Sequence, residues 1–269
     1  MKQRFSGRAA DQLRPISITY NVLEYTAGSV LFQIGRTKLI CAITLQNNVP
    51  AFLKGKKTGW LQAEYAMLPA ATHVRKEREV VGCKRNGRSV EISRLIARSL
   101  RSIVDLTALG ERTITIDCDV IQADGGTRTA AISGAYAALR VAIDRWLRQG
   151  ILQKDILKES IAAVSVGVTS GGLLLDLDYA EDNDIIADFN FVLTASGLLV
   201  EVQGTAEQAP IDWSLMHSMY VMALKGVKEI FVLTHNDRQL SPVEVSNSSK
   251  PPFNSINFRQ PRKSENSCG

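Results

Sequence analysis

Alternating apolar and polar residues predict β-strands in both halves of the chain. Residues 29–45 are predicted to form a hairpin, because two runs rich in β-branched residues flank a turn at Gly35. Residues 112–122 alternate with the period of two that is typical of a half-buried strand. The same pattern predicts two further hairpins and one short strand, at residues 162–179, 186–203 and 229–233.

Apolar residues spaced three and four apart predict three helices. The apolar residues of segment 89–105 form one stripe, made of Ile92, Leu95, Ile96, Leu100 and Ile103. Residues 129–147 predict a long helix of small residues, and a last helix is expected over about 212–225. Residues 50–88 are polar and rich in Gly and Lys, which indicates a loop-dominated segment.

Length and composition are those of an ordinary soluble globular protein. The 269 residues suffice for one large domain or two small ones, and 45% of them are hydrophobic and 22% charged. No apolar run approaches the roughly 20 residues that cross a bilayer, so no membrane association is expected. The N-terminal segment has no apolar stretch after its positive charges, which argues against a secretory signal and favours the cytoplasm.

Composition also divides the chain near residue 240. Residues 1–240 are predicted to form one folded domain, whereas residues 241–269 are rich in Ser, Asn, Pro and Lys and are predicted to be a disordered tail. The four cysteines form no CxxC pair, and two of them, Cys41 and Cys118, lie within apolar strand-like runs. We therefore expect the cysteines, Cys83 and Cys268 included, to be small core residues in a reducing compartment rather than disulfides or metal ligands.

Charge is distributed unevenly along the chain, whose net charge is +5. Residues 54–101 hold twelve Lys or Arg against four Glu, and residues 176–188 hold six acidic residues and no basic one. Together these blocks suggest a polyanionic ligand and a site for a divalent cation. The alternative is that each block is a solvated surface.

A paired-glycine turn is the first candidate for an anion site. The sequence Asp124-Gly125-Gly126-Thr127-Arg128 follows a predicted strand and opens a predicted helix. Free backbone N–H groups and the helix dipole attract anions in that setting, and glycines allow close backbone approach. Thr127 and Arg128 would add a hydroxyl and a guanidinium. A plain turn with an exposed arginine remains the alternative.

Arginines at the predicted helix 89–105 are further candidates. Arg88 lies at its start and can act as a second clamp on the same anion. Arg94, Arg98 and Arg101 are spaced four and three apart, so they form a basic ridge, or else an ordinary solvated helix surface. Residues 82–89 come close to a phosphate-binding loop of nucleotide triphosphatases, but no apolar strand precedes them, so that motif is rejected.

Carboxylates group at the second pair of predicted hairpins. Strand alternation places Asp176 and Asp178 on one face, with Asp182 following within a turn. Asp188 and Asn190 share a face of the next strand, opposite two phenylalanines. Such carboxylates can hold Mg²⁺ or supply a general acid, although a polar sheet face would give the same pattern.

Several common chemistries are poorly supported. The three histidines, His73, His217 and His235, are widely separated and show no zinc-site spacing, so each is interpreted as an incidental surface or packing residue. No GxSxG elbow and no GxGxxG fingerprint occurs. Hydrolysis by a triad of serine, histidine and aspartate is therefore not favoured.

From about Arg4 to Leu240, the chain resembles the ribonuclease PH family in the order and spacing of several long motifs. The blocks are GWLQAEYAMLP, GRSVEISRLIARSLRSIVDL, GERTITIDCDVIQADGGTRTA, LDLDYAED and VEVQGTAEQ. The resemblance implies an α+β fold of the ribosomal protein S5 domain 2-like type with two βαβ-like halves. It also implies a homo-hexameric ring, built as a trimer of dimers. The sequence departs from the family pattern at Ser6, Ala70 and Ile211-Asp212.

The resemblance also implies roles for individual residues. Arg88, Thr127 and Arg128, with the Gly126 turn, would hold the attacking phosphate. Asp182 and Asp188 would be the catalytic carboxylates and would bind Mg²⁺. Arg75 and Arg78 match basic positions in the family region linked to tRNA binding. Arg94 and Arg98, from the basic ridge, are also expected to bind RNA.

The activity that the resemblance implies is phosphorolysis of RNA. Inorganic phosphate would remove 3′-terminal nucleotides from tRNA precursors and release nucleoside 5′-diphosphates. The alternative is a catalytically inactive, RNA-binding subunit of an exosome-like ring. Arg128, Asp182 and Asp188 are all present, which favours the enzyme.

Overall fold

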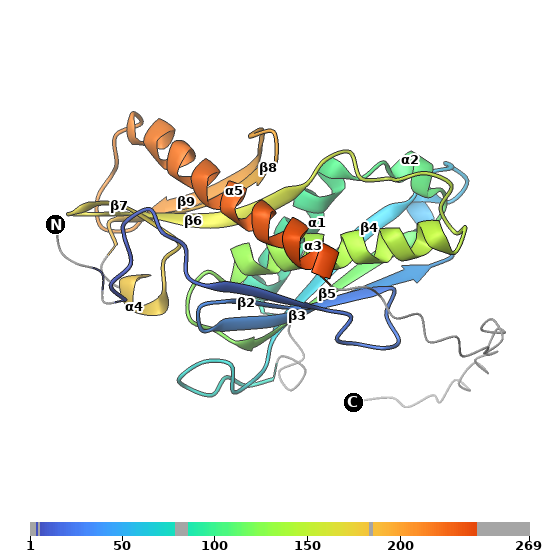
Figure 1. Ribbon diagram of the computed structural model, residues 1–269, viewed down its shortest axis with the longest axis horizontal. Helices are drawn as coiled ribbons and strands as arrows, with labels where there is room; N and C mark the ends of the chain where they lie inside the picture. The colour runs from blue at the N-terminus through green and yellow to red at the C-terminus, as the bar shows by residue number, and fades with distance from the viewer. Residues whose placement is uncertain (1–3, 5, 79–85, 183–184, 241–269) are drawn as a thin grey trace, which may run out of the picture.

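The first half of the chain forms a five-stranded sheet. The computed structural model describes residues 4, 6–78, 86–182 and 185–240, with side chains up to residue 234. The strands are β1 Ile16–Tyr20, β2 Gly28–Ile34, β3 Thr37–Gln46, β4 Trp60–Met67 and β5 Thr113–Gln122, in the order β1-β2-β3-β5-β4. Only β4 and β5 pair in parallel, and α1, Gly87–Ile103, connects them as a βαβ unit (Figure 1). A 3₁₀ turn at Ala51–Leu53 and a short α2 at Leu106–Leu109 lie in the connections.

The second half forms a four-stranded antiparallel sheet. Its strands are β6 Ile161–Thr169, β7 Gly172–Leu175, β8 Ala187–Thr194 and β9 Leu199–Ala206, in the order β7-β6-β8-β9. The one-turn helix α4, Tyr179–Asp182, follows β7, and α5, Leu215–Leu240, follows β9. The two hairpins predicted here are confirmed, as are the hairpin of β2 and β3 and the strand β5.

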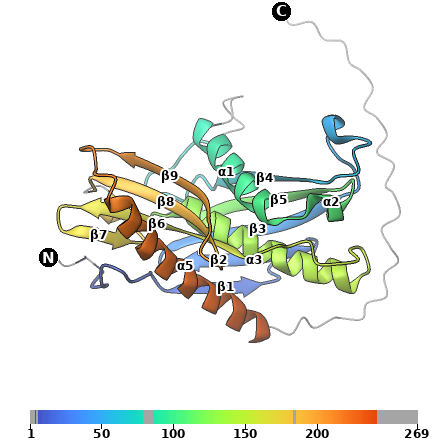
Figure 2. The same cartoon turned by 90° about the horizontal axis from the view of Figure 1, so that it is seen from above.

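The helix α3, Thr127–Arg148, packs between the two sheets (Figure 2). It contacts β2 and β3 on one side and β6 on the other, which explains why most of its length is buried and rich in alanine. Small residues let the layers approach closely. A Cβ on Gly134 would lie 3.0 Å from the sulfur of Cys41 and 3.1 Å from the Cβ of Phe32.

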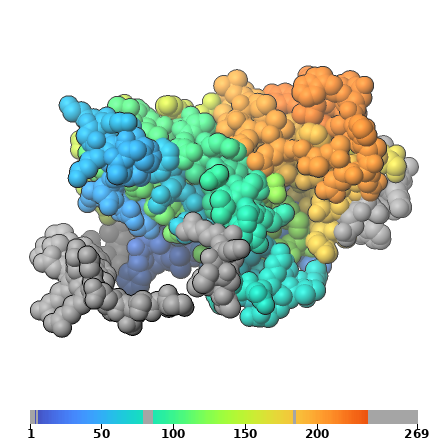
Figure 3. All heavy atoms as spheres, turned by 180° about the vertical axis from the view of Figure 1, so that it is seen from behind, coloured from blue at the N-terminus to red at the C-terminus, as the bar shows by residue number. Residues whose placement is uncertain are grey.

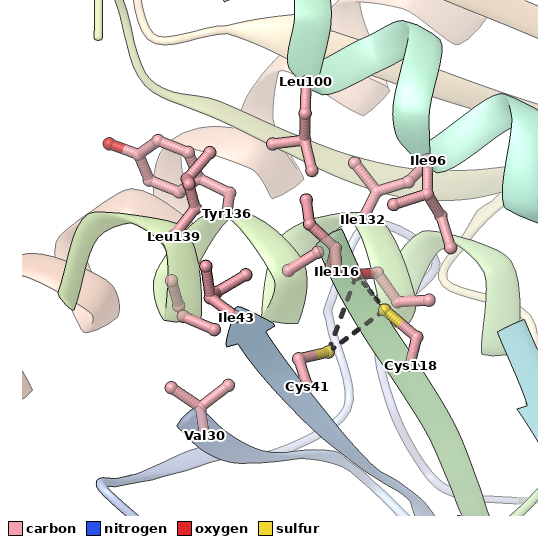
Figure 4. Close-up of a cluster of buried hydrophobic side chains, with 14 of the residues drawn as sticks. Val30, Cys41, Ile43, Ile96, Leu100, Ile116, Cys118, Ile132, Tyr136 and Leu139 are labelled. Carbon is pink, nitrogen blue, oxygen red and sulfur yellow. Dashed lines mark hydrogen bonds between the residues drawn. The ribbon is translucent and has the colours of Figure 1, made fainter. Parts of the chain in front are cut away.

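The main core lies between α1, α3 and the five-stranded sheet, and it contains the two described cysteines (Figure 4). Cys41 and Cys118 face each other across β3 and β5, with their sulfur atoms 3.6 Å apart and no disulfide between them. The contact with Cys41 and burial raise the pKa of the Cys118 thiol well above its ordinary value. The prediction of buried, reduced cysteines is confirmed at these positions; Cys83, Cys268 and the predicted tail lie outside the described residues.

A second core joins the four-stranded sheet to α5. Four of the buried residues of α5 recur three and four apart on the side that contacts β6, and they are Met219, Ala223, Val227 and Ile230. The predicted helix 212–225 is confirmed from Leu215 onward, but the strand predicted at 229–233 is wrong. The helix α5 continues unbroken through that segment to Leu240. Ile230 and Phe231 lie buried where the helix covers the sheet, whereas Val232 is 59% exposed.

The segment 50–88 is also more regular than predicted. Its residues Trp60–Met67 form β4, with Leu61 and Tyr65 buried against α1. Polar Gln62 and Glu64 alternate with them on the other face, and the parallel pairing with β5 supplies the hydrogen bonds. The α+β class is as predicted, and no helix in the described residues is long and apolar enough to span a membrane.

Candidate active site

A polar cleft of about 690 Å³ opens where the two halves meet. The first half contributes the end of β4, the loop after it, and the N-termini of α1 and α3. The second half contributes α4, β8 and β9. Figure 3 shows the two halves, coloured blue to green and yellow to orange, in contact on one face of the molecule.

The paired-glycine turn forms one end of this cleft, at the N-terminus of α3. Gly125 and Gly126 have φ angles of +78° and +62°, which disfavour any side chain. A Cβ on Gly125 would lie 2.7 Å from the carbonyl oxygen of Leu177. No side chain in the described part of the chain caps α3, so its first N–H groups are available to an anion in the cleft.

A buried ion pair fixes this turn against the second half. Arg14 donates from Nε and Nη2 to the Asp176 carboxylate at 2.9 and 2.7 Å, and from Nη1 to the carbonyl oxygen of Asp124 at 2.5 Å. Alternation predicted Asp176 on a strand face, and the structure shows that it lies outside the strand. β7 ends at Leu175, and Asp176 takes φ +54° to reach Arg14.

N-terminal arginines hold α4 in the same way. Arg4 donates to both Glu181 carboxylate oxygens at 2.6 and 2.7 Å, and Arg8 lies 3.3 Å from the same carboxylate. Asp178 caps α4, because its Oδ1 accepts from two backbone N–H groups at 3.0 Å each. The shared strand face predicted for Asp176 and Asp178 is thus wrong, and the turn instead positions Asp182.

Thr127 and Arg128 line the cleft beside the paired-glycine turn, and Arg128 makes this end of the cleft cationic. Arg128 donates to the side-chain oxygen of Gln203 on β9 at 3.2 Å and lies 3.7 Å from the Glu91 carboxylate. Tyr65 donates its hydroxyl to Thr127 Oγ1 at 2.9 Å. Burial raises the pKa of Tyr65, so its hydroxyl keeps its proton and orients the threonine.

Replacing Tyr65 with Phe is expected to lower the free energy of unfolding by about 1 kcal/mol, since one buried hydrogen bond is lost. Urea denaturation of both proteins checks the value. Because Thr127 would lose its orienting partner, the variant should also bind inorganic phosphate more weakly, which calorimetry can measure. Unchanged stability and unchanged phosphate binding would contradict this role.

Two carboxylates of the second half, Asp182 and Asp188, line the same cleft as these cationic groups. Burial and the nearby Asp182 raise the pKa of Asp188 from 3.8 to about 6, against opposing contributions from Asn190 and Arg128. Burial and Glu207 raise the pKa of Asp182, whereas Arg88 and Arg128 lower it. Asn190 donates to Asp188 Oδ2 at 3.2 Å, which confirms that they share a face of β8. The buried Oδ1 of Asp188 has no hydrogen-bond partner among the described residues.

Replacing Asp188 with Asn is expected to stabilise the fold above pH 6. A raised folded-state pKa means that the group's contribution to stability is fully present below about pH 4 and is lost as the pH rises through 6. Asn carries no charge, so the variant should gain about 1–3 kcal/mol at pH 8 and nothing near pH 4. Urea denaturation at both pH values tests this, and equal stability at pH 8 would refute it.

The structure places the predicted residues in two groups. The cleft is lined by Arg88, Gly126, Thr127, Arg128, Asp182 and Asp188. The predicted RNA-binding residues lie outside it: Arg75 and Arg78 are exposed in the loop after β4, and Arg94 and Arg98 are exposed on α1. Arg98 pairs with Glu201, donating from Nε at 3.2 Å.

Comparison with known proteins supplies the family. Residues 12–143 match the model of the 3′ exoribonuclease family, domain 1. The chain is 52% identical to "Ribonuclease PH" of Neisseria meningitidis over 234 residues, which cover 87% of this chain and 96% of that protein. This chain belongs to the ribonuclease PH family. "Ribonuclease PH" of Neisseria gonorrhoeae is 51% identical over 231 residues, covering 86% of this chain and 96% of the relative.

Solved structures support the ribonuclease PH fold. The crystal structure of rice (Oryza sativa) Rrp46 superimposes with a TM-score of 0.71 at 20% identity, covering 87% of this chain and 99% of that chain. A structure described as the Archaeoglobus fulgidus exosome with RNA bound to the active site gives a TM-score of 0.72 at 19% identity, covering 86% and 92%. These likenesses confirm the predicted α+β fold. The prediction of two βαβ-like halves holds for the first half, whereas all strand pairs described in the second sheet are antiparallel.

Sequence reasoning missed several residues of the cleft. Lys76, Gln203 and Glu207 line it, and Arg14 braces its glycine turn. Gln203 lies within the family motif VEVQGTAEQ, which was a signal for it. Arg14 belongs to no motif, and only its contact with Asp176, distant in sequence, reveals its role.

Proposed function

We propose that this chain is a phosphate-dependent 3′-to-5′ exoribonuclease that releases nucleoside 5′-diphosphates. One observation carries the proposal. Arg88, Arg128 and the N-terminus of α3 line the same cleft as Asp182 and Asp188, two carboxylates with raised pKa values, which supports an anion site beside a proton donor. Phosphorolysis needs both halves of this arrangement, because two anions must be brought together and a departing oxygen must be protonated.

The cationic end would hold the attacking phosphate. Arg88 and Arg128 can donate charge-assisted hydrogen bonds to it, and the N–H groups of α3 add the field of the helix dipole. Gln203 holds Arg128 and Tyr65 holds Thr127, so little reorganisation is needed when the anion arrives. These groups offset the repulsion between the incoming phosphate and the phosphodiester of the RNA.

The carboxylates would complete the reaction. A phosphate oxygen bonds to the phosphorus of the last phosphodiester, the bond from that phosphorus to the 3′ oxygen breaks, and the 3′ oxygen takes up a proton. When it binds no cation, Asp188 would be the favoured donor, since a pKa of about 6 leaves a protonated fraction near neutral pH. The products are a nucleoside 5′-diphosphate and an RNA shorter by one nucleotide.

The carboxylates also fit a divalent cation. Among the described residues, the buried Oδ1 of Asp188 has no hydrogen-bond partner, and the nearby Asp182 makes the ionisation of Asp188 more costly. Mg²⁺ binds through one or two carboxylates together with substrate oxygens, so Asp182 and Asp188 would hold it. Bound there, it would neutralise charge on the RNA phosphate. The described residues contain no cluster of three or more metal-binding side chains, which fits a cation shared with the substrate.

The proposed substrate is a tRNA precursor with extra 3′ nucleotides, processed in the cytoplasm. Residues 1–240 would be the catalytic unit, assembled as a homo-hexamer, a trimer of dimers. The body of the RNA would contact the exposed arginines outside the cleft, namely Arg75, Arg78, Arg94 and Arg98. Their exposure and the excess of basic residues over 54–101 support this part of the proposal.

Incubation with a 3′-extended tRNA and Mg²⁺, with and without inorganic phosphate, tests the function. Nucleoside diphosphates should form only when phosphate is present. Monophosphates formed without phosphate would mean hydrolysis. Bound RNA with no product would instead indicate an inactive RNA-binding subunit.

A further inference from the structure

Two aromatic rings at the rim of the cleft have no part in the mechanism above. His73 comes from the loop after β4, and Tyr179 is the first residue of α4. Both line the cleft, with ring centroids 5.4 Å apart and ring planes at 46°. Tyr179 is 51% exposed, so about half of its surface is accessible to a ligand in the cleft.

Both rings are held in place by contacts of their own segments. The pairing of Glu181 with Arg4 anchors the one-turn helix that carries Tyr179. The loop of His73 is closed by the backbone bond from Lys76 to Pro69, at 2.9 Å, and Ala71 accepts from the N–H of Ala123 at 2.8 Å. Because the rings come from different halves of the chain, their contact bridges the rim of the cleft. A flat ligand would meet a preformed surface.

The position of Tyr179 relates this surface to the reacting groups. Tyr179 and Asp182 are three residues apart in α4, so they lie on neighbouring positions one turn apart. The apolar side chains of Met67 and Val74 line the same cleft, and Val74 is 80% exposed. The cleft therefore offers arginines for a phosphate and, beside the carboxylates, apolar and aromatic groups for a flat ring.

We propose that Tyr179, supported by His73, forms the subsite for the base of the 3′-terminal nucleotide, which stacks on the exposed tyrosine ring. The inference rests on the proposed function and adds the recognition of the nucleotide that is removed. Stacking uses the π-face that every base has, so the subsite accepts all four bases. It fixes the terminal nucleotide so that the preceding bond faces the phosphate site.

Removing the ring of Tyr179 should weaken the binding of RNA and leave the binding of phosphate unchanged. Tyr179→Ala should raise KM for a short oligoadenylate by about 10-fold, the effect of losing one base stack, and leave KM for phosphate near the wild-type value. Tyr179→Phe keeps the ring and should behave as the wild type. Tyr25→Ala is the matched control, because Tyr25 is 95% exposed and lies outside the cleft.

An oligoadenylate whose last nucleotide lacks its base decides whether stacking is the cause. The wild type should bind it about 10-fold more weakly than the intact RNA, and Tyr179→Ala should bind both equally. An equal loss for Tyr179→Ala on both RNAs, or a loss for Tyr179→Phe, would overturn the subsite. The subsite would also be overturned if the effect of Tyr179→Ala depended on the base of the second-last nucleotide and not on the base of the last one. The wild-type comparison of the two RNAs remains decisive if Tyr179→Ala does not fold.

The proposed function is judged separately in the same experiment. Phosphate-dependent release of nucleoside diphosphate by the wild type from the intact oligoadenylate supports phosphorolysis whether or not Tyr179 stacks on the base. Failure of that release would count against the function and not against the stacking, which binding measured without phosphate reports independently.

Discussion

Replacing Arg128 with Ala is expected to lower kcat/KM for inorganic phosphate by about 10²- to 10³-fold. The guanidinium faces the cleft from the first turn of α3 and is already oriented by Gln203, so its loss removes a prearranged positive charge. The two anions would then repel each other with less compensation. Steady-state kinetics at varied phosphate, followed by release of nucleoside diphosphate, measure the effect.

RNA binding provides the contrast for this variant. Affinity for a 3′-extended tRNA should change little, because the exposed arginines outside the cleft are untouched. Arg148→Ala is the matched control, since Arg148 lies in the last turn of the same helix and is exposed. Wild-type phosphate kinetics in Arg128→Ala would show that Arg128 does not bind the attacking phosphate.

Replacing Asp188 with Asn is expected to slow phosphorolysis by about 10²- to 10⁴-fold at saturating phosphate and RNA. The amide keeps the shape of the side chain, but it cannot transfer the proton and is a weak ligand for Mg²⁺. The same variant is expected to be more stable than the wild type at pH 8. A slower but more stable protein separates loss of chemistry from loss of structure.

Asp182→Asn and Asp155→Asn complete this comparison. Asp182→Asn should slow turnover by about 10²-fold, because it removes a carboxylate that we propose binds Mg²⁺, and because it lowers the pKa of Asp188. Asp155 pairs with Arg140 away from the cleft, so Asp155→Asn should retain the wild-type rate. A normal rate in Asp188→Asn with a large loss in Asp182→Asn would move the proton donor to Asp182.

Local pattern predicts much of this fold because most elements bury one side against one of the two cores. The stripe of α1 and the alternation of β5 each follow directly from which side is buried. β4 escaped prediction because Gln62 and Glu64 on its outer face hid the alternation within a polar segment. The segment 229–233 of α5 was predicted as a strand because a short apolar run does not indicate that Ile230 and Phe231 pack on a sheet as part of a helix.

The site could be predicted only where local motifs carry it. The glycine turn places Thr127 and Arg128 at a helix N-terminus, which the strand-to-helix pattern already indicates. The acidic turn could not be predicted in this way, because Asp176 leaves the expected strand to meet Arg14, 162 residues away in sequence. Contacts of that range depend on the assembled fold and leave no local pattern.

Phosphorolysis by this cleft is tested most directly with ¹⁸O-labelled inorganic phosphate and a 3′-extended tRNA, with mass spectrometry of the released nucleotide. The account predicts nucleoside diphosphates whose terminal phosphate carries the label, and their loss in Arg128→Ala. Unlabelled nucleoside monophosphates, formed at the same rate without phosphate, would contradict it.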